Sequence, residues 1–274
     1  MKRLLIALVS LALITSCEKV VNPDIDQSTP QIVIEGLLTN KDTTHFVKVS
    51  RSIQFYESGV NPIKDATVVV RHGTDTYSYT HNPMAVDSLD GYYFSDTPYA
   101  GAIGEAYTLS VNTGGITYEA TDSMKYVTNI DSLAVVLAPN VDDEDREAGR
   151  IYQVLLFAKE PKETVDFYQF QFFSNDTLIT SAESIYVFSD EILGDRLDGL
   201  PSPVLFKEGE KAGVEIYSLT KEQYLFYTDL SNLLNSDGGM FSPPPANPRN
   251  TFTNNALGLW QVSAVREGSI LIEP

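Results

Sequence analysis

The chain has 274 residues, of which 43% are hydrophobic and 11% aromatic, so it can bury a core and is not a disordered tail. Its formal net charge of −18 at pH 7 argues against nucleic acid or anionic lipid as a partner, because both repel an acidic surface. An acidic surface that serves only solubility is the alternative explanation.

The segment Met1–Cys17 has the pattern of a lipoprotein signal peptide. Lys2-Arg3 supplies positive charge, and Leu4–Ile14 is an apolar run of about eleven residues, which suits a signal peptide and is too short to cross a bilayer as a helix. The run closes on Ile14-Thr15-Ser16-Cys17, which resembles a bacterial lipobox. We therefore expect residues 1–16 to be removed and Cys17 to be acylated. Cleavage by the ordinary signal peptidase, with Cys17 incidental, is the alternative.

Acyl chains on Cys17 would hold the protein at a membrane, because each buried methylene contributes about 0.8 kcal/mol and stable attachment takes at least two chains. Cys17 is the only cysteine, so no disulfide supports the fold. Residues 17–30 are predicted to be the lipidated cysteine and a polar tether rich in Asp and Pro.

From Gln31 onward the chain has short strand patterns separated by turns, without helical periodicity. The predicted strands are Gln31–Leu38, His45–Ser50, Thr67–Arg71, Thr76–Thr80, Tyr92–Ser95, Tyr107–Val111 and Ile116–Thr121. Asn112–Gly115 is a strong turn signal, because its paired glycines reach positive φ cheaply. This pattern predicts a small β-sandwich over residues 31–125.

Residues 126–274 predict a second β-rich domain. Its expected strands are Leu133–Leu137, Ile151–Lys159, Phe167–Ser174, Thr177–Thr180, Ile185–Ser189, Val204–Phe206, Glu215–Leu219 and Leu259–Val265. Pro139–Gly149 is predicted to be an acidic loop. The aromatic face of Phe167–Ser174 and the single tryptophan, Trp260, are expected in the core, and a sugar-binding platform is the alternative for such aromatics.

One helix is predicted near residues 221–235. Thr220 and Gln223 have the spacing of a capping box, in which each side chain bonds the backbone N–H of the other. Tyr227, Leu230 and Leu234 then recur at helical spacing.

The first part resembles the carboxypeptidase-regulatory-like or transthyretin-like β-sandwich. The motifs that carry this resemblance are Ile63–Val70, Gly91–Phe94 and Tyr107–Val111. The resemblance covers roughly Gln31 to Asp122 and implies an immunoglobulin-like or transthyretin-like sandwich.

The whole mature chain is similar to Bacteroidota lipoproteins of the domain-of-unknown-function family 4249. The matching features are the lipobox, Asn22–Asp24, Ile32–Asn40, the Asp65-Ala66 strand start, Phe167-Tyr168, Ser242–Pro248 and Ala256–Trp260. The family offers no catalytic residue. The resemblance implies an outer-membrane location and a role beside TonB-dependent transporters.

The residues themselves give little sign of catalysis. His45, His72 and His81 lack the spacing of a metal site and are expected at the surface. No nucleophile elbow, phosphate loop or dinucleotide fingerprint occurs, so we predict no catalytic residue and no cofactor. Asp142–Asp145, and the acidic set Asp190, Glu191, Asp195 and Asp198, lack the spacing of a calcium loop, so solvated acidic loops are expected there rather than a metal site.

The Pro-rich loop from Gly238 to Asn250 is the candidate partner contact. Long ordered loops in compact domains often serve function, and proline lowers the entropy lost on docking. The residues of the predicted contact are Met240, Phe241, Pro243, Pro244 and Pro245. A strap that covers one end of the sandwich is the alternative.

These observations together predict a mainly β, lipid-anchored protein that is not an enzyme. The leading hypothesis is an accessory or binding lipoprotein of the outer membrane that assists a TonB-dependent transporter in nutrient uptake. A carbohydrate-binding or adhesion module at the cell surface is the alternative, and it predicts exposed aromatic side chains on one edge of the sandwich. A hydrolase with a dispersed site is a third hypothesis, and it requires a cleft with a histidine or paired carboxylates of perturbed pKa.

Overall fold

The computed structural model describes residues 29–54, 58–159, 165–180, 185–192, 196–236 and 246–273. Within these ranges the protein is mainly β, which confirms the predicted class, and it has two α-helices. None of the helices in these ranges is long and apolar enough to cross a membrane.

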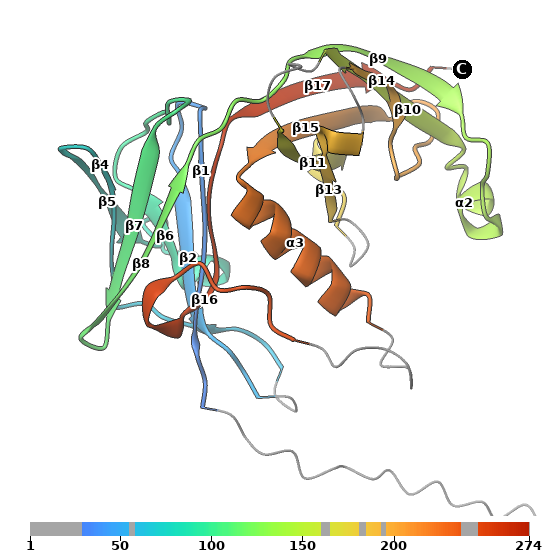
Figure 1. Ribbon diagram of the computed structural model, residues 1–274. Helices are drawn as coiled ribbons and strands as arrows, with labels where there is room; N and C mark the ends of the chain where they lie inside the picture. The colour runs from blue at the N-terminus through green and yellow to red at the C-terminus, as the bar shows by residue number, and fades with distance from the viewer. Residues whose placement is uncertain are drawn as a thin grey trace, which may run out of the picture.

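The first sheet has nine strands and includes the predicted strands of residues 31–125. They are β1 Ile32–Thr39, β2 Phe46–Arg51, β3 Asn61–Pro62, β4 Thr67–His72, β5 Asp75–His81, β6 Tyr92–Ser95, β7 Ala106–Thr113, β8 Ile116–Ser123 and, from far along the chain, β16 Leu257–Ser263. In the sheet the strands follow the order β16-β1-β2-β6-β5-β4-β7-β8, and β3 pairs with β2. A short 3₁₀ helix, η1, spans Asp87–Leu89 between β5 and β6. The sheet curls until it is nearly closed (Figure 1).

The side chains of β1 point alternately to the core and to the outer face of the first sheet, and this alternation determines the register in which the strand pairs. In β1 the residues Ile32, Ile34 and Leu38 are buried, whereas Glu35 points to the outer face. The turn between β7 and β8 has Gly114 at φ 59° and Gly115 at φ 78°, as the sequence predicted.

Strand β16 pairs with β1 in parallel, from Val33 opposite Leu257 to Thr39 opposite Ser263. Trp260 points inward from β16, is fully buried, and donates a hydrogen bond from Nε1 to the carbonyl oxygen of Tyr107 in β7, 3.0 Å away. The prediction that Trp260 packs in the core is confirmed.

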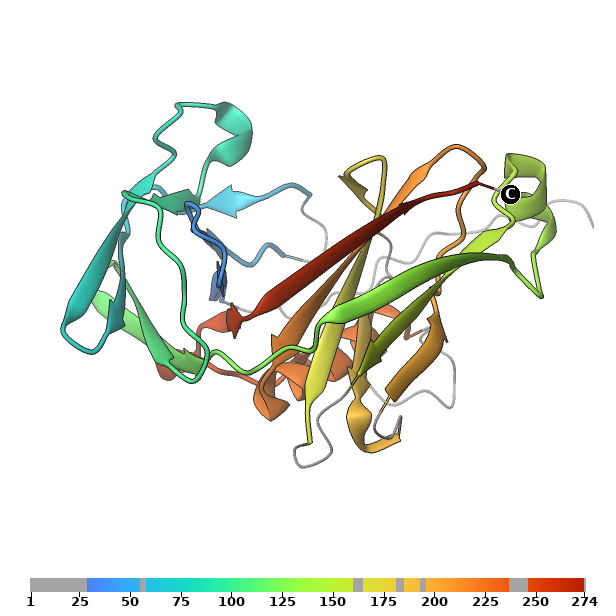
Figure 2. The same cartoon turned by 90° about the horizontal axis from the view of Figure 1, so that it is seen from above.

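Two smaller sheets make up the rest of the molecule. One is β14-β10-β9, with β9 Ile130–Leu137, β10 Tyr152–Lys159 and β14 Arg196–Pro201. The other is β12-β11-β15-β17 with β13 paired to β11, where β11 is Phe167–Ser174, β12 Thr177–Leu178, β13 Tyr186–Ser189, β15 Lys211–Leu219 and β17 Val265–Leu271. Strands β9 and β17 run side by side and bring the two smaller sheets together (Figure 2).

Helix α3, Lys221–Leu234, confirms the predicted helix and its capping box. Thr220 Oγ1 accepts from the N–H of Gln223, and Gln223 Oε1 accepts from the N–H of Thr220 at 2.7 Å. The helix lies beneath the five-stranded sheet, on the side of the first sheet (Figure 1).

Several local predictions were wrong. The expected loop Pro139–Gly149 contains helix α2, Asp143–Ala148, which Asp142 caps by accepting from the N–H of Asp145 and which ends at Gly149 with φ 77°. The final segment is two strands rather than one, because the chain leaves the first sheet at Ala264 and continues as β17 in another sheet. Val204–Phe206 makes only a bridge between Phe206 and Tyr152.

The chain has one main core that crosses from the first sheet to the smaller sheets. It includes Val47 and Leu109 from the first sheet and Phe170 and Ile216 from the five-stranded sheet. Tyr168, Phe170 and Phe172 are all buried, so the prediction for the aromatic face of β11 is confirmed. A smaller cluster lies at the far end and consists of Val154, Phe206, Ala212 and Ile272.

Candidate functional site

The residues that the sequence put forward as sites lie outside the described residues. These are Cys17 and the loop residues Met240, Phe241, Pro243, Pro244 and Pro245. The structure therefore describes other surfaces, of which two recesses and one polar cluster have the clearest geometry.

The larger recess is a cleft of about 870 Å³ between the first sheet, the start of β11 and the N-terminal end of α3. Its lining includes Asp122 and Ser123 of β8, Phe167 of β11, Thr220 and Lys221, and Arg249. This volume lies within the range of small-molecule sites in proteins, roughly 300–1,000 Å³.

Asp122 lies at the base of this cleft and joins three elements. Its carboxylate accepts from Thr220 Oγ1 at 3.2 Å, from Gln223 Nε2, and from the N–H of Val262 in β16 at 2.8 Å. Burial raises the pKa of Asp122 to about 6, although these hydrogen bonds favour the ionised form.

Basic and acidic side chains both line the cleft. Arg249 binds both carboxylate oxygens of Asp229, at 2.8 and 3.1 Å, and this hydrogen bonding lowers the pKa of Asp229. Lys125, Lys221, Asp166 and Glu222 belong to the same lining. The cleft therefore offers both donors and acceptors to a ligand, without an excess of one charge.

The smaller recess is an apolar groove of about 440 Å³ between α3 and the outer face of β16, β1 and β2. Leu37, Phe46, Phe226 and Leu257 form much of its wall. Part of its lining is polar, because Tyr227 donates to Gln261 Oε1 at 2.6 Å.

A row of aromatic side chains continues from this groove over the outer face of the first sheet. The rings of Phe46 and Tyr92 have centroids 5.7 Å apart, and those of Tyr92 and Phe94 are 6.3 Å apart. All three side chains are partly exposed, and Lys48 Nζ lies 5.7 Å from the centre of the Tyr92 ring.

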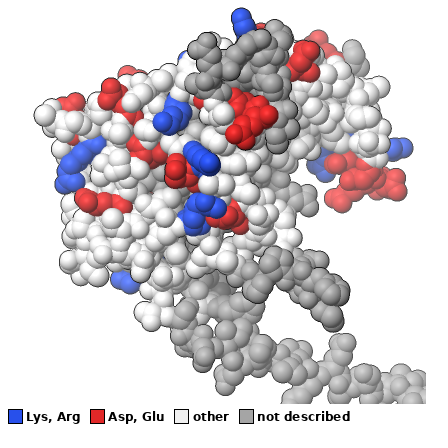
Figure 3. All heavy atoms as spheres, viewed as in Figure 1, with Lys and Arg blue, Asp and Glu red and all other residues white. Residues whose placement is uncertain are grey.

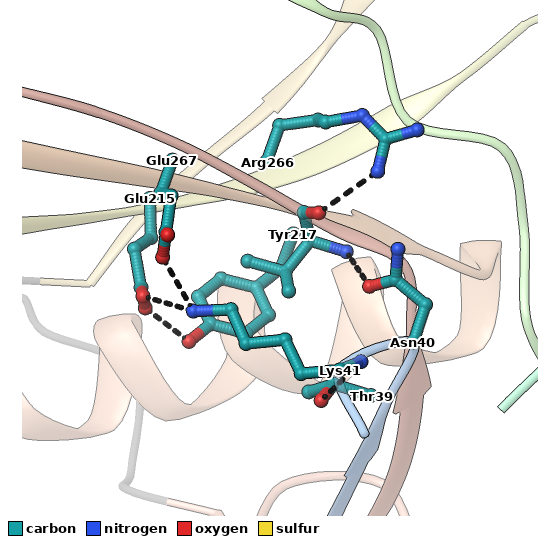
Figure 4. Close-up of polar contacts among 8 residues, drawn as sticks. Thr39, Asn40, Lys41, Glu215, Tyr217, Arg266 and Glu267 are labelled. Atoms are coloured by element: carbon teal, nitrogen blue, oxygen red, sulfur yellow. Dashed lines mark hydrogen bonds and ion pairs between the residues drawn. The ribbon is translucent and has the colours of Figure 1, made fainter. Parts of the chain in front are cut away.

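The polar cluster, which we call the joint, connects the turn after β1 to strands β15 and β17 (Figure 4). Lys41 Nζ lies 2.9 Å from Glu215 and 2.6 Å from Glu267, and Tyr217 donates to Glu215. Burial opposes the charge of Lys41, but its hydrogen bonds to Glu267 and Glu215 outweigh that and raise its pKa. The same hydrogen bond from Lys41 lowers the pKa of Glu267.

Within the joint, Glu267 does not have the electrostatics of a general acid. A general acid needs a carboxyl group with a raised pKa, whereas Lys41 keeps Glu267 ionised. Its lysine and carboxylates instead tie the first sheet to the five-stranded sheet.

The three histidines lie apart, and the prediction that they are surface groups was wrong for His45. That side chain is buried, its Nε2 lies 2.8 Å from the carbonyl oxygen of Tyr99, and burial lowers its pKa. His72 pairs with Glu105 at 3.0 Å, and His81 Nε2 accepts from the N–H of Gly91.

The acidic segments have structural roles in the described parts of the chain. Asp142 caps α2, and Asp145 pairs with Arg150 at 2.6 Å. Asp198 lies in strand β14, which the sequence did not predict. Within the described ranges no group of three or more His, Cys, Asp or Glu residues is placed to hold a metal ion.

Asp122 is the site residue that sequence reasoning missed. It was placed after the predicted strand, yet β8 continues to Ser123 and puts Tyr118, Ala120 and Asp122 on one face. An aspartate in phase with two buried residues is the signal that could have identified it.

A comparison with protein-family models matches residues 18–269 to the family described as a domain of unknown function, DUF4249. No curated protein matches the chain.

Proposed function

The chain belongs to the DUF4249 family, and from that premise we propose that it is a lipid-anchored accessory or binding lipoprotein of the outer membrane that assists a TonB-dependent transporter in nutrient uptake. The observation that carries the proposal is the segment Met1–Cys17, which has a positive start, a short apolar run and a lipobox that ends on the only cysteine.

The two recesses support a binding role. A cleft of about 870 Å³ with mixed donors and acceptors suits a small polar nutrient, and the neighbouring apolar groove suits a protein or peptide surface. In this proposal the first sheet corresponds to the transthyretin-like sandwich of Bacteroidota lipoproteins and the two smaller sheets form the second domain.

The anchor is tested with Cys17→Ala in the full chain. The unchanged protein is expected in the membrane fraction with acyl chains on its N-terminal peptide, as measured by mass spectrometry. C17A is expected in the soluble fraction of the envelope. Membrane association of C17A equal to that of the unchanged chain would contradict the lipid anchor.

The partner is tested by purifying the tagged, lipidated protein from its own outer membrane in mild detergent. A TonB-dependent transporter in stoichiometric amount is the expected companion. A variant without Pro243–Pro245 is the matched comparison. If this variant is folded but no longer brings the transporter with it, the transporter contact is assigned to that loop. Recovery of the protein alone would contradict the accessory role.

A carbohydrate-binding module is the second candidate, and the aromatic row Phe46, Tyr92 and Phe94 favours it. Partly exposed rings on one face of a sheet can stack against sugar rings, and Lys48 and Glu35 lie beside them as hydrogen-bonding groups. Glycan arrays with the unchanged protein and with Tyr92→Ala separate the two functions, because this candidate requires glycan binding that Y92A loses.

A further inference from the structure

The end of the first sheet at which β1 begins has a distinct surface, which we call the tether end. In the register of the sheet Ile32 lies opposite Arg51, and Arg51 lies opposite Asn61 of β3. The N–H of Ser52 donates to the carbonyl oxygen of Gln31 at 2.8 Å. The segments 29–32, 51–54 and 58–62 therefore meet at one place.

The turn between β7 and β8 belongs to the same end. The segment before β16 contains the 3₁₀ helix η3, Thr253–Asn255, and leads to Leu257, which pairs with Val33 near the start of β1. Asn254 Nδ2 donates to the carbonyl oxygen of Thr117 at 2.7 Å, at the start of β8. Residues 112–116 and 251–256 thus complete the tether end.

Large apolar side chains are exposed on this surface. Val60 is 65% exposed, Ile116 49% and Ile53 39%. They come from three separate segments of the tether end, so their exposure is not the property of one loop. Single exposed apolar residues are ordinary, but three of them at one end of a sheet can enter the same interface together.

The described residues of the tether end also include no acidic side chain. Its described residues include one charged residue, Arg51, although the chain has 37 Asp and Glu residues. The lower part of the molecule in Figure 3 is correspondingly mostly white, whereas red and blue side chains lie above it. Among the described residues, this surface carries no negative charge that would oppose its approach to a lipid headgroup layer.

The described chain begins with Thr29 at the tether end, so any anchor on Cys17 is attached there. Cys17 precedes Thr29 by only twelve residues, and at about 3.3–3.6 Å per residue such a segment spans about 40 Å at most. The described chain starts at the lower end of the first sheet in Figure 1. An anchor on Cys17 therefore attaches the protein to the bilayer through the tether end and keeps Thr29 within about 40 Å of it.

We propose that the tether end is a membrane-contact surface, on which Val60, Ile116 and Ile53 enter the headgroup region and fix the orientation of the protein on the bilayer. The inference rests on the proposed lipid anchor at Cys17 and adds to it a second contact. The acyl anchor and a second, weaker contact at the same end would together keep the cleft and the aromatic row clear of the lipid.

Site-directed labelling tests this orientation in the full, lipidated chain. Cys17 is the only cysteine and its thiol is consumed by acylation, so Val60→Cys and Ile116→Cys each add one reactive thiol for a polarity-sensitive dye. Leu137→Cys is the matched control, because Leu137 is 66% exposed at the end of β9 in the three-stranded sheet. The labelled proteins are reconstituted into phosphatidylcholine vesicles that contain lipid spin-labelled near its headgroup.

The dyes at positions 60 and 116 are expected to lose most of their fluorescence in these vesicles, and the dye at position 137 is expected to lose little. Equal quenching at all three positions, in protein that floats with the vesicles, would overturn the proposed contact and leave the anchor intact. Protein that does not float with the vesicles would instead overturn the proposed anchor, and this inference with it. Circular dichroism of each variant confirms that the comparison is made on folded protein.

Discussion

Single residues in this protein hold together elements that are far apart in the sequence. Asp122 bonds to side chains and backbone about a hundred or more residues away, at Thr220, Gln223 and Val262. Trp260 bonds to Tyr107 across the interior of the first sheet. Both residues can therefore be tested by their effect on the whole fold.

Asp122 is expected to make stability depend on pH. In the native state it keeps its proton up to about pH 6 because burial raises its pKa, whereas an unfolded aspartate loses its proton near pH 4. The native state therefore binds more protons between these values, and the free energy of unfolding should fall as pH rises from 4 to 6. The expected fall is roughly 3 kcal/mol, measured by urea denaturation across this range.

Asp122→Asn is the matched control for that pH dependence. Its amide oxygen can accept from Val262 and Gln223, and its amide nitrogen can donate to the hydroxyl of Thr220, so the contacts are kept without a titrating group. The variant should lose the part of the pH dependence that belongs to residue 122. An unchanged pH profile in D122N would show that Asp122 ionises normally in the native state.

Gly36 is expected to tolerate no side chain. A Cβ atom there would lie 2.7 Å from Cε3 of Trp260 and 3.3 Å from Cγ2 of Val47. Gly36→Ala should therefore destabilise the protein by about 1–3 kcal/mol and shift the fluorescence of its single tryptophan. Gly268→Ala is the control, since its Cβ meets side chains no closer than 3.3 Å. Equal stability of G36A and G268A would contradict the close packing against Trp260.

At the scale of elements, Thr220 at the start of α3 both caps the helix and bonds to the first sheet. Its capping box satisfies the first backbone groups of the helix, and the same Thr220 hydroxyl donates to Asp122 of the first sheet. The helix start is thereby fixed both to its own backbone and to a neighbouring element.

Thr220→Ala should lower the free energy of unfolding by about 0.5–2 kcal/mol, because it removes the cap of α3. Thr220→Ser keeps the hydroxyl and should recover most of this loss. Denaturant unfolding of the two variants beside the unchanged chain gives the comparison. A loss in T220S as large as that in T220A would assign the effect to the methyl group and not to the hydroxyl.

The elements that the sequence predicted well are those with local signals. The alternation in β1, the glycine turn before β8 and the capping box of α3 each depend on residues within a few positions of one another. Strand β14 and helix α2 were missed because acidic residues suggested loops, although Asp142 and Gly149 are ordinary helix caps.

The candidate site could not be predicted in the same way, because its parts come together only in the folded chain. The cleft needs β8, α3 and β16 side by side, and no local pattern indicates that β16 pairs with β1. The switch at Ala264 is likewise hidden, because Leu259–Val265 has the pattern of one continuous strand.

For the whole molecule, the joint around Lys41 determines how the first sheet meets the five-stranded sheet. Glu215 and Glu267 lie directly opposite each other on β15 and β17, and Lys41 neutralises both from the turn after β1. Without the lysine, two like charges would face each other across neighbouring strands.

Lys41→Met should lower the midpoint of thermal unfolding at low salt, and high salt should restore most of the difference because it screens the repulsion between Glu215 and Glu267. The loss should be modest, about 1 kcal/mol or less, since Lys41 is partly exposed. Lys48→Met is the control, because it removes a single pair to Glu35 at 3.5 Å. Equal effects of K41M and K48M at both salt concentrations would contradict this role of the joint.

The parallel pairing of β1 with β16 has a consequence for the order in which the protein is made. A ribosome delivers Ile32 long before Leu257, so the first strand of the sheet is synthesised without one of its two neighbours. Until residue 263 has been added, the open edge of β1 can pair with another chain, which is the usual route to aggregation. The first sheet therefore cannot be completed until nearly the whole chain is present, and its folding is a late event.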